Sequence, residues 1–93
     1  MAWNYLIKIK PYFDNINGNS YHAGRIYDTR TEELVAVLPF AYGDEYMGLN
    51  HAYNVVSGFQ SEKMHLHDVK RLCTTVCLTD TGEEDCRNYG KED

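Results

Sequence analysis

Residues 17–27, NGNSYHAGRIY, decide how the chain begins to fold, because a turn sequence runs directly into a strand sequence. The dipeptide Asn17-Gly18 readily takes the positive φ angles of a tight hairpin turn. Residues 20–28 then alternate in character, which is typical of a strand. Alternation divides these side chains between two faces: Tyr21, Ala23, Arg25 and Tyr27 on one, His22, Gly24 and Ile26 on the other. We therefore expect the second strand of a hairpin, with one polar-aromatic face.

The residues before this turn predict the first strand of the hairpin. Residues 2–10 also alternate, which is typical of a half-buried strand. One face of this strand carries Trp3, Tyr5, Ile7 and Ile9. Pro11 has no N–H to donate to a ladder, so we expect the strand to end there. The two strands should pair antiparallel.

The following residues predict a third strand and then a helix. Residues 33–38, ELVAVL, form a short apolar run that Pro39 closes. This strand completes a three-stranded meander. Asp44 is expected to be the N-cap of a helix, because its carboxylate can accept from the free N–H groups of the first turn. Apolar residues then recur at helical spacing as far as Gly58, a residue type that often ends helices.

The C-terminal third predicts one more strand and a tail. Residues 70–79 alternate and are rich in β-branched side chains, which favours a strand beside the first one. Residues 81–93 are acidic and lack an apolar period, so we expect a loosely ordered tail after a single domain of residues 1–80. The predicted fold is α+β: an antiparallel four-stranded sheet in the order β-β-β-α-β, with one helix on one face. The open face would be available for interactions.

Composition limits the functions that fit this chain. It has 93 residues, a net charge of −5 and a pI near 5.2, which argues against broad binding to phosphate backbones. A local basic stretch at residues 63–71, with exposed tyrosines, keeps a nucleic-acid or nucleotide binder as an alternative. The N-terminus does not look like a signal peptide, and no stretch is long enough for a membrane span. Three cysteines, an odd number, agree with reduced thiols in a cytoplasm.

Two kinds of chemical site are not expected. Zinc-competent side chains occur in the C-terminal third: His65, His67, Cys73, Cys77 and Cys86. Their spacing does not match a known zinc pattern, and on a strand Cys73 and Cys77 would lie about 13 Å apart. Because the residue types are nevertheless competent to bind zinc, a small zinc-binding protein stays as an alternative. No nucleophile motif is present, and we expect neither an enzyme nor a cofactor.

Two segments of the chain resemble a recurring pattern in small bacteriophage-encoded proteins: NGNSYHAGRIYD at residues 17–28 and LPFAYGDEYMGLNHAYNVV at residues 38–56. Those proteins begin one strand with an N-T-Y-H-like sequence and enter a helix through a P-F-x-Y-G-x-x-x-Y-like sequence. The match covers roughly residues 3–80. Ser20 stands where Thr is common, and the tail from Gly82 departs from the basic ending of the group. The resemblance implies a phage origin and a cytoplasmic life in an infected bacterium, but no particular activity.

Small acidic phage proteins often bind and inhibit host machinery, so we expect a phage accessory protein that binds and modulates a host protein. The target could be a defence or transcription component. Tyrosine and arginine are common interface anchors. The expected partner-binding residues are therefore Tyr21, His22, Arg25, Tyr27, Tyr42, Asp44 and Tyr46. A homodimer is also plausible, whereas neither a nucleic-acid partner nor a membrane is expected.

Overall fold

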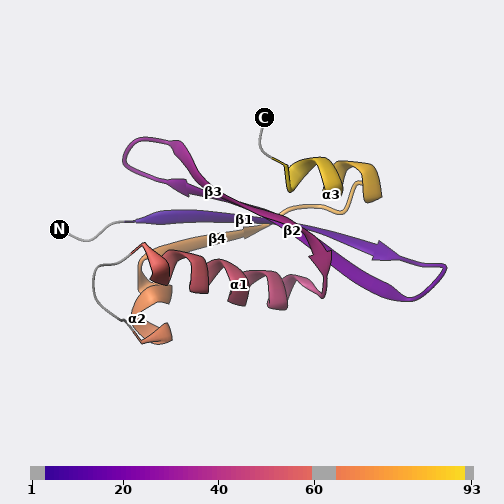
Figure 1. Ribbon diagram of the computed structural model, residues 1–93, viewed down its shortest axis with the longest axis horizontal. Coiled ribbons are helices and arrows are strands. Elements are labelled where there is room, and N and C mark those ends of the chain that lie inside the picture. Colours follow the sequence, from indigo (N-terminus) through magenta and orange to yellow (C-terminus); the bar gives the residue numbers. More distant parts are fainter. Residues whose placement is uncertain (1–3, 60–64, 92–93) are drawn as a thin grey trace.

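The computed structural model describes residues 4–59 and 65–91. The protein is α+β, and its four strands form one mixed sheet in the order β3-β2-β1-β4. The strands are β1 (Tyr5–Asp14), β2 (Asn19–Asp28), β3 (Glu33–Tyr42) and β4 (Cys73–Cys77). The helices in the described residues are α1 (Glu45–Gly58), α2 (Leu66–Arg71) and α3 (Glu83–Tyr89). Helices α1 and α2 lie on one side of the sheet and α3 lies on the other (Figure 1). The prediction of a single helix is therefore wrong.

The meander of β1, β2 and β3 is confirmed, but β1 and β3 continue past the prolines that were expected to end them. Leu78 donates its N–H to the carbonyl of Ile9, so the backbone polar groups of Ile9 point toward β4. The backbone of Pro11, two residues further along β1, points the same way. Strand β4 ends opposite Ile9, and Pro11 lies where this ladder stops, since it has no N–H to extend it. Pro39 lies on an edge strand at a break in the register with β2, where a proline is also tolerated.

The last strand was correctly placed beside β1, but it runs parallel rather than antiparallel. The chain leaves β3 at Tyr42, which pairs with Tyr21 near the hairpin end of the sheet. Helix α1 carries it back along the sheet, and β4 then begins beside Tyr5. Because β4 and β1 start at the same end, they must be parallel. The strand is also shorter than predicted, since residues 66–71 form α2.

The acidic C-terminal segment contains a helix, so the expectation of a loosely ordered tail is wrong for residues 83–89. Cys86 of α3 is fully buried against the sheet, and its thiol donates to the carbonyl of Lys10 over 3.3 Å. Arg25 donates from Nε to the carbonyl of Tyr89 over 3.0 Å, and its guanidinium lies 4.7 Å from the centre of that ring. Helix α3 therefore covers part of the face that was expected to be open.

The main hydrophobic core lies between the sheet and α1. The prediction that Tyr5, Ile7 and Ile9 share a buried face is confirmed, whereas Trp3 lies outside the described residues. The remaining core side chains come from β2, β3, α1 and α2: Ile26, Leu38, Ala52, Val56 and Val69. Within the described ranges, no helix is both long enough and apolar enough to cross a membrane.

Candidate binding surface

Four aromatic rings form a continuous row across three strands near the hairpin end of the sheet. The row consists of Tyr12 on β1, Tyr21 on β2, and Phe40 and Tyr42 on β3. The ring of Tyr21 stacks on Tyr12 at a centroid distance of 6.0 Å and on Phe40 at 5.0 Å. Tyr42 meets Tyr21 edge-on at 5.7 Å. Tyr42 is 66% exposed, so one end of this aromatic row is open to a partner.

The sheet register brings these rings together. Tyr12 pairs directly with Tyr21, and Tyr21 pairs with Tyr42. Side chains of directly paired residues lie on the same face and close enough to touch. Tyr21 also shares its face with Arg25, which contacts α3. The aromatic row therefore lies on the α3 side of the sheet, opposite α1.

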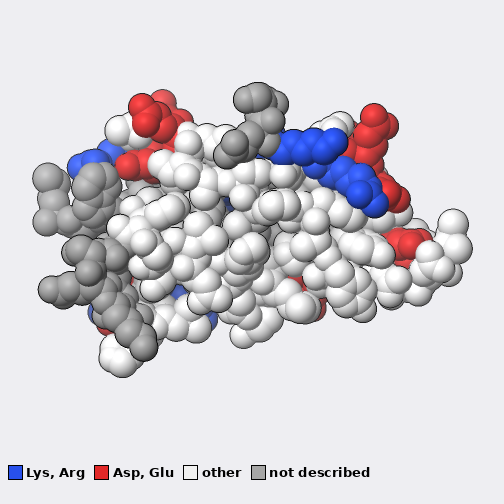
Figure 2. Space-filling model, viewed as in Figure 1, with Lys and Arg blue, Asp and Glu red and all other residues white. Residues whose placement is uncertain are grey.

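Charged side chains surround the aromatic row. Arg87 of α3 places its guanidinium 4.3 Å from the centre of the Phe40 ring and forms an ion pair with Glu83 at 2.7 Å. At the other end, partial burial raises the pKa of Tyr12, and the negative charges of Asp14, Glu83 and Asp80 raise it further. In Figure 2, acidic and basic side chains gather near α3, whereas the middle of the visible surface carries none. The row thus has carboxylates at its Tyr12 end and the guanidinium of Arg87 on its Phe40 ring.

Two of these carboxylates also hold local structure. Asp14 accepts from the backbone N–H of Ile16 at 2.9 Å and from the side-chain amide of Asn17 at 2.8 Å. The hydrogen bond from the Asn17 side chain is the main reason that the pKa of Asp14 is lowered. Asp80 accepts from the N–H groups of Phe13 and Gly82, at 3.0 and 2.9 Å. Both carboxylates are therefore fixed in position beside the row.

Three of the seven predicted binding residues make contacts within the protein. His22 is only 3% exposed, and its Nδ1 lies 3.0 Å from the carbonyl of Gly43. Its ring packs against α1, where a Cβ on Gly48 would come within 3.0 Å of it. The guanidinium of Arg25 binds the segment at the end of α3, as described above. Asp44 caps α1 by accepting from the N–H of Met47 at 3.0 Å, which confirms the predicted cap.

The other four predicted residues do not form one surface. Tyr21 and Tyr42 belong to the aromatic row. Tyr46 is 66% exposed but lies on α1, a helix on the other side of the sheet. Tyr27 lies further along β2, under the ammonium group of Lys8 at 5.4 Å from the ring centre.

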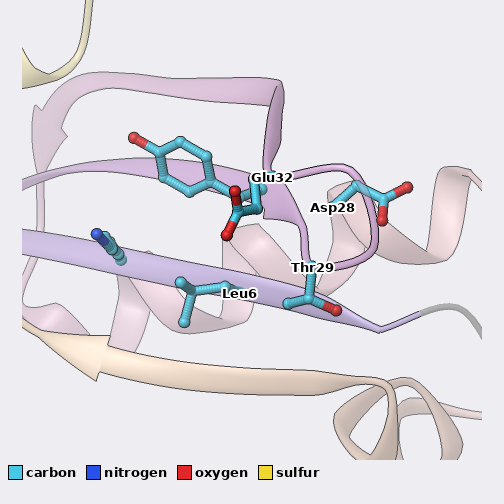
Figure 3. Close-up of a pocket in the computed structure, with 6 residues that line it drawn as sticks. Leu6, Asp28, Thr29 and Glu32 are labelled. Atoms are coloured by element: carbon cyan, nitrogen blue, oxygen red, sulfur yellow. The ribbon is translucent and has the colours of Figure 1, made fainter.

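Tyr27 lines a separate hollow of about 280 Å³ at the opposite end of β1 and β2. Its other lining residues are Leu6, Lys8, Asp28, Thr29 and Glu32. In Figure 3, the carboxylate of Asp28 points away from Leu6 and Glu32, and it accepts from the N–H of Arg30 at 2.8 Å. The hollow is shallow, and its lining includes one basic residue, Lys8, and two acidic residues, Asp28 and Glu32. Its chemistry indicates no particular ligand.

The zinc alternative finds no converging ligands in the described part of the chain. No group of three or more His, Cys, Asp or Glu side chains there could hold a metal ion. Cys73 and Cys77 are on β4 and act electrostatically on Tyr53 of α1, whereas Cys86 is buried beneath α3 on the other face. Burial raises the pKa of Cys73 and Cys86 to about 11. These thiols are therefore protonated at neutral pH.

Sequence reasoning missed Tyr12 and Arg87, which complete the candidate surface. Tyr12 was missed because the first strand was expected to end at Pro11. Continuing the hairpin from its turn would have paired Tyr12 with Tyr21. Part of the basic stretch at residues 63–71 lies outside the described residues. Comparison with the models of known families, with curated proteins and with solved structures finds no match for this chain.

Proposed function

We propose that the protein is a phage accessory protein that binds and modulates a host protein in the bacterial cytoplasm. The observation that carries this proposal is the aromatic row, which leaves four rings side by side at a surface. Exposed aromatic clusters of this kind are typical of protein interfaces, where rigid rings bury much area at a small entropy cost. The phage origin and the host partner rest on the resemblance of residues 17–28 and 38–56.

Tyr42 offers a direct test, because a second tyrosine provides a matched control. Tyr42 and Tyr46 are both 66% exposed, but only Tyr42 belongs to the aromatic row. Tagged wild-type protein and the variants Tyr42→Ser and Tyr46→Ser would each be used as bait in a bacterial lysate, with and without nuclease. Captured proteins would be identified by mass spectrometry, and the melting temperature of each bait would be recorded.

We expect a specific protein to be captured by the wild type and by Tyr46→Ser but to be reduced at least about tenfold with Tyr42→Ser, the loss expected for one interface anchor. Capture should survive nuclease. Equal capture by both variants would show that the aromatic row is not the interface. Loss of capture on nuclease treatment would favour the nucleic-acid alternative instead.

A further inference from the structure

The aromatic row has carboxylates at its Tyr12 end, and this combination indicates the chemistry of its partner. We propose that the row binds a basic segment of the partner protein, with arginine or lysine side chains stacked on the rings and paired with these carboxylates. This inference rests on the proposed function and specifies what the surface recognises.

The row already holds one guanidinium from its own chain. Arg87 lies 4.3 Å from the centre of the Phe40 ring, and on the same face Arg25 lies 4.7 Å from the ring of Tyr89. A planar guanidinium stacks on an aromatic face because the face of the ring carries negative charge density. The rings of Tyr21 and Tyr42 continue the same row beyond Phe40, and no cation–π contact is found on either of them among the described residues.

The carboxylates at the Tyr12 end favour a cation over an anion. In the described residues neither Asp14 nor Asp80 forms an ion pair. Glu83, in the first turn of α3, also acts on Tyr12 with its negative charge. A nucleic acid would bring phosphates against these groups, although its bases could stack on the rings. A second copy of the chain would bring the same carboxylates, and like charges repel. A basic peptide satisfies both features.

A pair of peptides that differ only in charge tests the proposal without knowledge of the natural partner. The first is a short glycine-serine peptide containing three arginines, and in the second each arginine is replaced by citrulline, which has the same shape but no charge. Each is titrated into ¹⁵N-labelled protein while amide chemical shifts are followed by NMR. We expect the arginine peptide to shift signals around Tyr12, Tyr21 and Tyr42, and the citrulline peptide to bind far more weakly.

Two variants separate the charge beside the row from overall charge. Asp80→Asn removes one carboxylate beside the row, and Glu33→Gln removes one at the far end of β3. We expect Asp80→Asn to weaken binding of the arginine peptide about two- to fivefold, as for an exposed ion pair, and Glu33→Gln to leave it unchanged. If Asp80→Asn lowers the melting temperature, Tyr42→Ser serves as the second test, with Tyr46→Ser as its control.

Three results would overturn the proposal: equal binding of both peptides, shifts that lie away from the row, or stronger binding of oligothymidylate at the row. Concentration-dependent shifts at the row without peptide would assign it to a dimer instead, which also overturns the proposal. The two proposals fail differently. If capture of a partner depends on Tyr42 but not on Asp80 or on salt, the proposed function stands and the basic-partner inference is wrong.

Discussion

Gly90 should be the most sensitive position at the junction between the C-terminal helix and the sheet. A Cβ at this position would lie 2.6 Å from the backbone nitrogen of Phe40, 3.0 Å from the carbonyl oxygen of Leu38 and 3.1 Å from the Cβ of Ala23. The first two atoms belong to the backbone of β3, which cannot rotate away as a side chain can. Gly90 has φ −87°, a value that alanine also adopts. Any penalty for Gly90→Ala must therefore come from the close contact and not from the backbone angle.

The expected penalty follows from the cost of overpacking. Forcing an extra methyl group into a closely packed site typically costs about 1–3 kcal/mol. For a domain of this size, each kcal/mol lowers the melting temperature by roughly 4–8 °C. We therefore expect Gly90→Ala to melt roughly 4–24 °C below the wild type, in a thermal scan followed by circular dichroism.

A matched substitution and a second measurement identify the cause. Gly58→Ala adds the same methyl group at the end of α1, where nothing lies within 4 Å, so it should leave stability unchanged or raise it by up to about 1 kcal/mol. If the contact at Gly90 is relieved by lifting α3, the buried Cys86 should react faster with a thiol reagent. A Gly90→Ala variant that melts with the wild type and protects Cys86 equally would refute the docking of α3 described above.

Three further outcomes are expected. Asp44→Ala should destabilise the protein by about 1 kcal/mol in urea unfolding, because the N–H of Met47 loses its cap, whereas Asp44→Asn should lose little; equal losses would contradict the capping role. Burial raises the pKa of Cys73 and Cys86 to about 11, so the unfolded chain ionises first. Stability from these thiols is full below about pH 9 and falls between pH 9 and 11, and urea unfolding should show a flatter decline for Cys86→Ala. At pH 8, iodoacetamide should modify the exposed Cys77 before the buried Cys86, as followed by mass spectrometry.

The local patterns in the sequence were sufficient for the hairpins and for α1. The alternation of residues 20–28 and the turn at Gly18, which has φ 72°, led directly to β2 and its two faces. Asp44 marked the start of α1 correctly, because N-capping depends on neighbouring residues alone. Such features need no knowledge of the rest of the fold.

The misplaced elements depend on what lies beside them in space. Pro11 is compatible with β1 only because β4 ends before reaching it, and no local pattern reports where another strand ends. Helix α3 is seven residues long and buries Cys86 as its one fully covered side chain, which is too little for an apolar period. Its stability comes from contacts with Lys10 and Arg25, far away in sequence.

For the candidate surface, residue type alone gave a mixed set. Of the predicted residues, Tyr21 and Tyr42 are in ring contact, whereas His22 and Arg25 make hydrogen-bond contacts within the fold. A polar side chain on a strand looks equally available whether or not a helix later covers it. The position of α3 decides which of these side chains stay available. Helix α3 binds Arg25 through the carbonyl of Tyr89, but it leaves the part of the aromatic row beyond Phe40 uncovered.

Helix α3 also makes the candidate surface depend on the C-terminal segment. Arg87 occupies the outer face of Phe40 and is held there by its ion pair with Glu83. Glu83 in turn supplies part of the negative charge felt by Tyr12. A change that lifts α3 from the sheet would therefore uncover the ring of Phe40 and move the Glu83 carboxylate away from Tyr12 at the same time. The candidate surface and the acidic C-terminal helix form one unit, so Gly90→Ala, at a buried position, should weaken the proposed partner binding together with stability.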